Sequence, residues 1–202
     1  MQFPPQDFNE SVKKLCDELV PSGVPLIVRC SPAEGGAVNE CFPNVEAYSK
    51  THGGSLVHGW ALWDWVGEMI EGEFHGVWMS PEGELVDISP RVIPLRWIMF
   101  LPDPSTVFEG CQVNNVRIPL TDNDLIRRMI KNANDCFDVM NAGGLKEYTG
   151  EVAFNSRDHP REFALHEEKA RIEVELAQFL IPRVIPRMMQ LSSLHPPNPC
   201  QW

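Results

Sequence analysis

Apolar residues along the chain follow two different spacings, and the change from one to the other marks the expected elements. Phe8, Val12 and Leu15 recur every three to four residues, which is typical of one face of a helix. Between Met69 and Met79 the pattern alternates instead, as it does in a strand with one face toward a core. These spacings predict helices over 7–20, 41–50, 122–140 and 159–179, and strands over 25–30, 56–65, 69–79, 84–89, 96–101 and 116–120.

The order of these elements predicts an α+β fold. The turn signal at 80–83 joins two of the strands into an antiparallel hairpin. We therefore expect an antiparallel sheet with the helix that begins at Cys41 packed against it and further helices outside. A chain of 202 residues suffices for one substantial core, so residues 1–190 are expected to form a single globular domain. Prolines from 182 onward are expected to break regular structure, and residues 191–202 to form a Pro-rich C-terminal tail.

The charge of the chain excludes two classes of partner. The formal net charge is −11, with 17 Lys and Arg against 28 Asp and Glu. Nucleic acids and anionic membranes are bound through clustered basic side chains, so neither is expected as a partner. The N-terminal residues lack the basic and apolar regions of a secretory signal, and no apolar run reaches the roughly 18 residues of a membrane-spanning helix. A cytoplasmic location is therefore predicted.

The six cysteines are widely and irregularly spaced, and none forms a C-x-x-C pair. Such spacing does not predict a structural zinc site, and no cofactor is expected. In a reducing compartment the thiols stay free, and most free thiols are small buried hydrophobes. The remaining question is whether one of them is placed for chemistry.

Cys41 has a setting that the other cysteines lack. It follows the Gly-rich segment 31–39 and begins a predicted helix, where a thiolate faces free backbone N–H groups and the positive end of the helix dipole. His75 and Asp87 lie on the polar faces of two successive predicted strands, so a hairpin would bring the two side chains together. An imidazole held by a carboxylate can accept the thiol proton, which is what a thiol nucleophile requires.

Three short motifs carry these residues: Asn39-Glu40-Cys41-Phe42, His75-Gly76-Val77-Trp78 and the segment 83–90 (GELVDISP). Over residues 38–90 the chain resembles the transglutaminase-like branch of the papain-like cysteine enzymes. The resemblance implies a papain-like or transglutaminase-like core, with a Cys nucleophile at a helix start, a His on a strand and an Asp on the next strand. It also implies acyl-enzyme chemistry on an amide, peptide or ester. The chain departs from the family in having Asn39 where Gly is common and Phe42 where Trp is common.

Further side chains are candidates for contact with the substrate. The backbone N–H of Cys41 would help to form an oxyanion hole, with the amide of Asn39 as the first candidate for a second donor and that of Asn44 as the next. Candidates for lining the substrate cleft are Trp60, Trp63 and Glu73. Tryptophans in such a pattern more often belong to a core, so the core is the alternative for these two.

The sequence predicts a thiol-dependent acyl-transfer enzyme: a peptide, isopeptide or amide hydrolase (a thiol protease among them), a deamidase or a transferase. Cys41 would be the nucleophile, His75 the general base and then acid, and Asp87 the carboxylate that orients the imidazole. The substrate would be a protein, a peptide, or an amide or ester small molecule. One alternative is a non-catalytic protein-binding or inhibitory module on the same scaffold. Another is a metal-dependent hydrolase with ligands drawn from His58, Glu73, His75 and Asp87.

Overall fold

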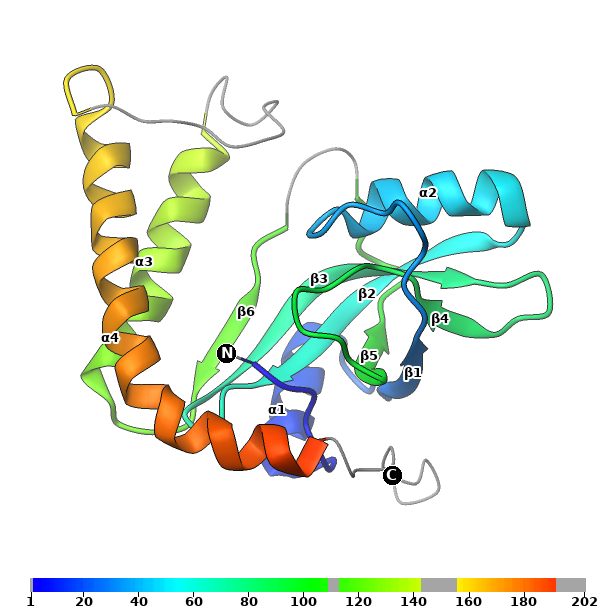
Figure 1. The fold of residues 1–202 in the computed structure, drawn as a ribbon, viewed down its shortest axis with the longest axis horizontal. Helices are drawn as coiled ribbons and strands as arrows, with labels where there is room; N and C mark the ends of the chain where they lie inside the picture. The colour runs from blue at the N-terminus through cyan, green and yellow to red at the C-terminus, as the bar shows by residue number, and fades with distance from the viewer. Residues whose placement is uncertain (1, 109–112, 143–155, 192–202) are drawn as a thin grey trace.

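The computed structural model describes residues 2–108, 113–142 and 156–191 of the chain (Figure 1). All the predicted helices and strands are present, and their bounds lie within three residues of the predicted ones, except at the end of the last helix. In chain order the elements are α1 (Glu10–Leu19), β1 (Leu26–Cys30), α2 (Cys41–His52), β2 (Ser55–Asp64), β3 (Met69–Met79), β4 (Leu85–Asp87), β5 (Trp97–Pro102), β6 (Val116–Pro119), α3 (Asp124–Met140) and α4 (Pro160–Leu191).

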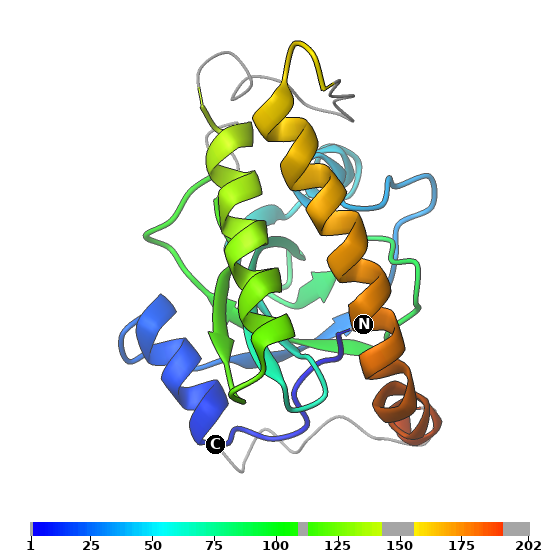
Figure 2. The same ribbon diagram turned by 90° about the vertical axis from the view of Figure 1, so that its left-hand side faces the viewer.

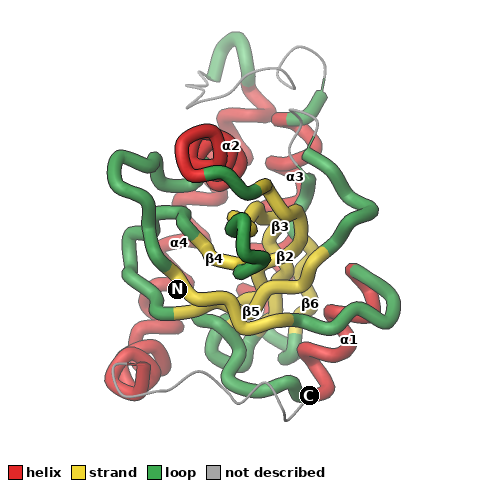
Figure 3. The backbone as a smooth tube through the Cα atoms, turned by 90° about the vertical axis from the view of Figure 1, so that its right-hand side faces the viewer, coloured by secondary structure: helices red, strands yellow, loops and turns green. Residues whose placement is uncertain are grey.

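Five of the strands close into a barrel, which Figure 3 shows with α2 above it. β2 is antiparallel to β3 along its whole length and to β5 through residues 59–62. β5 pairs with β1, β1 with β4, and β4 returns to β3, which completes the ring. β6 pairs with the first four residues of β3 and extends the wall as a sixth strand.

The expected antiparallel sheet is wrong, because the sheet is mixed and closed on itself. β1 runs parallel to β4, with Cys30 opposite Asp87. A parallel pair needs a long connection, and here α2, β2 and β3 lie between the two strands in the chain. Alternation within one strand shows which side chains share a face, but it does not show which distant strand is the neighbour. The sequence pattern therefore could not predict the closure.

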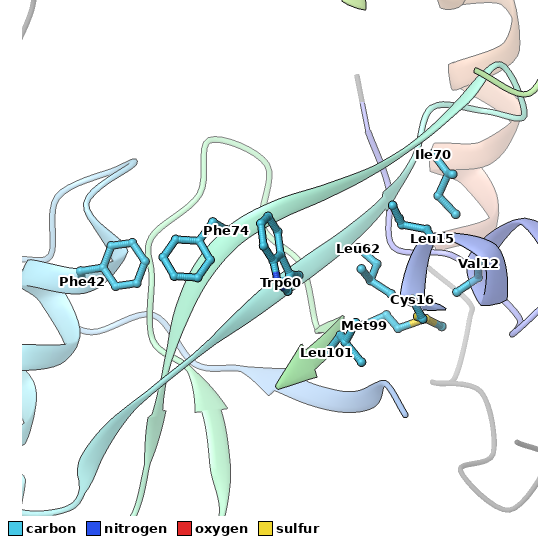
Figure 4. Packing of buried hydrophobic residues seen from close by; sticks show 10 residues of the cluster. All are labelled: Val12, Leu15, Cys16, Phe42, Trp60, Leu62, Ile70, Phe74, Met99 and Leu101. Atoms are coloured by element: carbon cyan, nitrogen blue, oxygen red, sulfur yellow. The ribbon is translucent and has the colours of Figure 1, made fainter. Parts of the chain in front are cut away.

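Closure gives the strands an inner and an outer face. The inner face holds a cluster that contains no buried helix residue and consists of Val28, Ala61, Trp63, Val77, Ile98 and Phe100. The outer face packs under α1 and the start of α2, through the residues drawn in Figure 4: Val12, Leu15, Cys16, Phe42, Trp60, Leu62, Ile70, Phe74, Met99 and Leu101. Alternate residues of β2 and β5 thus belong to different clusters, so both faces of these strands are apolar.

α3 and α4 form an antiparallel pair that stands beside the barrel (Figure 2). The pair meets the barrel in a third cluster, where Ile126 of α3 and Ile172 and Leu176 of α4 pack with Met69 of β3. α3 also contacts β6. These contacts fix the two helices next to the β3–β6 part of the wall.

α4 was expected to end at residue 179, and this expectation is wrong because the helix continues to Leu191 with Pro182 and Pro186 inside it. Each proline removes one backbone hydrogen bond and favours a bend, and Figure 1 shows α4 changing direction toward its C-terminal end. Leu180 and Val184 stay buried in the third cluster and hold the bent segment in place. The predicted tail lies outside the described residues from position 192 on. No helix in the described ranges is both long and apolar enough to cross a bilayer.

A substitution at Gly59 tests the contact between β2 and β5. A Cβ at this position would stand 2.3 Å from the backbone oxygen of Leu101. Such an approach forces the two strands apart, so Gly59→Ala is expected to destabilise the fold by about 2 kcal/mol. Chemical denaturation followed by tryptophan fluorescence measures the change. Ser55→Ala, at the exposed start of the same strand, is the control and should stay within about 0.5 kcal/mol of wild type. Equal stability of Gly59→Ala and wild type would contradict this strand pairing.

Candidate active site

A cleft opens where β4 and β6 diverge along β3. β2 occupies one edge of β3, while on the other edge β4 pairs with residues 78–79 and β6 pairs with residues 69–72. Between them, no strand of the described chain pairs with this edge over residues 73–77. Glu73 and His75 belong to this open stretch, and their side chains line a cavity of about 270 Å³.

The polar face of β3 points into the barrel and not toward solvent. Glu71 and His75 are only 4% and 3% exposed, and Val77 on the same face belongs to the inner cluster. The opposite face of β3 is apolar and lies under α1 and α2. Closure of the barrel has therefore turned carboxylate and imidazole side chains inward, where each one needs a polar partner.

Asp87 supplies that partner for His75. The register of β3 with β4 places Asp87 diagonal to His75 on the inner face, as the predicted hairpin requires. The Asp87 side chain is fully buried, and its Oδ1 lies 3.1 Å from Nε2 of His75. The backbone N–H of Ser89 donates to the same oxygen at 3.1 Å. The carboxylate is thus held in one orientation toward the ring.

Burial and charge act in opposite directions on this pair. Burial by itself lowers the pKa of His75, but the charge and the hydrogen bond of Asp87 outweigh it and raise the pKa to about 10. Burial likewise raises the pKa of Asp87, but the imidazolium, the Arg91 guanidinium and the Ser89 N–H together hold that pKa below its usual value. At neutral pH the ring is therefore protonated and the carboxylate ionised.

Cys41 is the first residue of α2, and its side chain lines the same cleft as His75. Nε2 of the ring is bonded to Asp87, which leaves Nδ1 for the sulfur, and hydrogen bonding with Cys41 contributes to the raised pKa of His75. N–H groups in the first turn of a helix lack intrahelical acceptors, and Glu40 provides no side-chain cap. The backbone N–H groups of Cys41 and Phe42 therefore remain available as donors beside the sulfur.

Arg91 is a member of the site that the sequence pattern did not reveal. Its guanidinium donates to Oδ2 of Asp87 from Nη2 at 2.9 Å and from Nε at 3.3 Å. Nη2 also lies 3.5 Å from Nε2 of His75, and Cζ lies 4.8 Å from the centre of the Trp63 ring. Arg91 lies in a loop, where the hydrophobic pattern does not predict which way a side chain points. Its position four residues after Asp87 was the one feature of the sequence that could have indicated the ion pair.

Three other described cysteines lie where their thiols stay protonated. Cys30 donates to Oδ2 of Asp87 at 3.8 Å, and burial together with this carboxylate raises its pKa to about 12. Burial also raises the pKa of Cys16 to about 12, and it raises the pKa of Cys136. Cys41 is thus the described thiol that lies beside an imidazole held by a carboxylate.

The two amide candidates for the oxyanion hole have different surroundings. Asn39 lines the cleft two residues before Cys41, in the left-handed backbone region at φ 64°. Asn44 uses its amide to hold the loop before α2: Oδ1 accepts from the Ala37 N–H at 3.0 Å, and Nδ2 donates to the Ala37 carbonyl at 2.7 Å. Of the two, Asn39 is the one that borders the cleft.

Among the side chains predicted to line the cleft, Trp63 and Glu73 do so and Trp60 does not. Trp60 belongs to the outer cluster, where its Nε1 donates to Oδ2 of Asp103 at 3.0 Å. Trp63 belongs to the inner cluster and donates from Nε1 to Oε2 of Glu73 at 2.7 Å. Because strand residues alternate between faces, two tryptophans three positions apart must separate.

The four side chains proposed as metal ligands do not form one group, although His75 and Asp87 are in contact. Within residues 2–108, 113–142 and 156–191, no three His, Cys, Asp or Glu side chains lie close enough to hold an ion. His58 stacks on Phe42 of the outer cluster, with 5.6 Å between ring centres, whereas His75 and Glu73 line the cleft. The metal-dependent alternative therefore gains no support from the described residues.

Replacing Asp87 tests the electrostatics of His75. Without the carboxylate, burial remains as the main influence, so Asp87→Asn is expected to lower the pKa of His75 from about 10 to below 6.5. NMR titration of the imidazole C–H resonances measures both values. Glu82→Gln, which removes an exposed carboxylate from the turn before β4, is the control and should leave the titration unchanged. An unshifted His75 in Asp87→Asn would contradict this account.

The same pair predicts how stability depends on pH. The raised pKa of His75 adds stability that is fully present below pH 6.5 and is lost as pH rises through about 10. The lowered pKa of Asp87 adds stability that is present above pH 3.8 and is lost as pH falls through the lowered value. The stability difference between wild type and Asp87→Asn is therefore expected to be largest between these limits, at pH 3.8–6.5, and to shrink toward pH 10. Urea denaturation across this range measures it, and a difference that grows above pH 6.5 would contradict the expectation.

Comparison of the chain with family models, with curated proteins and with solved structures finds no match in any of the three.

Proposed function

We propose that the chain is a thiol-dependent acyl-transfer enzyme, with Cys41 as nucleophile, His75 as general base and acid, and Asp87 as the carboxylate that orients the imidazole. One observation carries this proposal. The Cys41 thiol and the His75 ring share a cleft, and the far nitrogen of the ring is bonded to a fully buried carboxylate. An activated thiol requires these parts: a proton acceptor within reach and a group that holds the acceptor in place.

The reaction would proceed in two steps. The Cys41 thiolate attacks the carbonyl carbon of the substrate, and the imidazolium of His75 donates its proton to the leaving amine or alcohol. This step leaves a thioester between Cys41 and the acyl group. Water or an amine then gives a proton to the neutral imidazole and attacks the thioester, which releases the acyl product and restores the thiolate and the imidazolium. Hydrolysis and transfer differ only in this second nucleophile.

The surroundings of the pair suit both steps. Asp87 favours the protonated ring, so the proton for the leaving group is in place at neutral pH. The backbone N–H groups that begin α2 and the amide of Asn39 are the proposed donors to the oxyanion, because they lie next to Cys41 in the chain and Asn39 borders the cleft. These donors act on charge that develops only during the reaction.

Two further observations support the proposal. The matched residues of the transglutaminase-like resemblance are Cys41, His75 and Asp87, and such enzymes act on peptide, isopeptide, amide or ester bonds. The described cysteines are free, which supports a reducing compartment such as the cytoplasm.

Selective alkylation tests the activated thiol. At about pH 6.5 an ordinary thiol is about 1% ionised, and a neighbouring imidazole speeds the reaction of a nucleophilic cysteine by accepting its proton. Cys41 is therefore expected to react with iodoacetamide about 10- to 100-fold faster than the other thiols of the folded protein, and His75→Ala to remove this advantage. Mass-spectrometric mapping of the labelled peptides over a range of pH identifies the modified residue.

Cys41→Ser is the matched control, because it nearly keeps the size of the side chain and removes the thiol. Wild type is expected to release a burst of p-nitrophenol from p-nitrophenyl acetate, equal to the amount of acyl-enzyme formed, and Cys41→Ser is expected to show none. If Cys41 reacts no faster than the other thiols, the enzyme proposal is wrong and a non-catalytic binding module is the better description.

A further inference from the structure

The catalytic cleft adjoins a second, larger cavity. This cavity of about 760 Å³ is walled by β3, by the segment that contains β6, and by α3 and α4. Gln2 and Glu73 line both cavities, so these two side chains form the boundary between them. A substrate that is bound at Cys41 and extends into the larger space therefore passes Glu73.

The charges at the catalytic cleft cancel one another except for that of Glu73. Asp87 is paired with Arg91, with 2.9 Å between Oδ2 and Nη2. In the proposed mechanism Cys41 and His75 share one proton, either as thiol and imidazole or as thiolate and imidazolium, so their summed charge is zero. Among the described side chains that line the cleft, Glu73 is therefore the surplus charge, and it is negative.

The larger cavity shows the same balance. Glu71 is neutralised by Arg117, with 2.8 Å between Oε1 and Nε. Lys169 pairs with Glu173 at 3.9 Å. The carboxylates, amines and guanidinium groups of its described lining are these two pairs and Glu73. The lining also contains His166. The carboxylate at the boundary is thus unbalanced on both sides.

Glu73 keeps one carboxylate oxygen for a ligand. The Trp63 indole donates to Oε2 at 2.7 Å and so fixes the orientation of the carboxylate, while Oε1 accepts no hydrogen bond from the described residues. Alternate residues of a strand stand about 7 Å apart, so the backbone of Glu73 lies about that far from the backbone of His75. Reacting atoms must approach to about 3.5 Å, so a group bound at Glu73 is a substituent of the substrate and not the bond that reacts.

We propose that Glu73 determines specificity by binding a positively charged substituent of the substrate, of the guanidinium or ammonium class, one strand repeat along β3 from His75. The inference rests on the proposed function, because it assigns a preference to the substrate of that site. A guanidinium or ammonium group donates to Oε1 and supplies the positive charge that both cavities lack. Acyl substrates with an Arg-like or Lys-like side chain beside the reacting carbonyl meet this requirement, and acidic ones are repelled.

Charged methanethiosulfonates measure this preference directly. The Cys41 thiolate displaces methanesulfinate and forms a mixed disulfide, which carries either a trimethylammonium-ethyl or a sulfonato-ethyl group into the cleft. Mass spectrometry follows the rate at Cys41 with each reagent. Glu73→Gln removes the charge and keeps an oxygen for the Trp63 N–H, and it is expected to lower the ratio of the cationic to the anionic rate about tenfold.

Glu46→Gln is the matched control, because it removes the same charge from an exposed position of α2 outside the cleft. Its rate ratio is expected to stay within about twofold of wild type. The wild-type ratio should also fall as salt rises from about 0.01 M to about 1 M, because the screening length shortens from about 30 Å to about 3 Å. An unchanged ratio in Glu73→Gln at low salt overturns the proposal, and so does a wild-type ratio that does not depend on salt.

The neutral methyl methanethiosulfonate separates this test from that of the proposed function. If Cys41 reacts with it no faster than a thiol in an unfolded peptide, the enzyme proposal fails, and the charge ratio still reports on cation binding at Glu73. If Cys41 is activated and the ratio does not respond to Glu73→Gln, the substrate preference alone fails.

Discussion

The Asp87 carboxylate is fully buried where β4 lies between β1 and β3, and the strands around it supply what this burial requires. An uncompensated carboxylate inside a protein is destabilising by several kcal/mol. His75 of β3, Arg91 of the following loop and Cys30 of β1 each bring a hydrogen bond to it. Because these partners come from separate parts of the chain, the buried charge of Asp87 helps to hold β1 on one side of β4 and β3 on the other. It also fixes the orientation of the His75 imidazole.

Closure of the barrel decides what the inner face of β3 can do. Next to the pairing with β4 at residues 78–79, this face carries Val77 and contributes to an apolar cluster. Where β4 and β6 diverge, it carries Glu73 and His75 and borders a cleft. The start of α2 rests on the outer cluster through Phe42, which brings Cys41 to the rim of the opening. The packing that stabilises the fold thus also sets the position of the thiol relative to the ring.

Trp63 links the two carboxylates that line or support the cleft. Its indole N–H holds Glu73, and the guanidinium that neutralises Asp87 lies over its ring. The acid–base chemistry and the recognition of a charged substituent that we propose would therefore share one continuous wall. A buried tryptophan, 1% exposed, keeps both groups at fixed positions without adding a charge of its own.

The sequence by itself determined the elements of the described chain, the start of a helix at Cys41 and the hairpin that pairs His75 with Asp87, because caps, turns and alternation are signals between near neighbours. Tertiary structure decided the rest. The parallel contact of β1 with β4, the inward turn of the polar face of β3 and the place of Arg91 depend on contacts between residues far apart in the chain. The passage of α4 through two prolines depends on the burial of Leu180 and its neighbours against the barrel. The spacing of apolar residues along the chain does not predict such contacts, since it shows which residues share a face and not what covers that face.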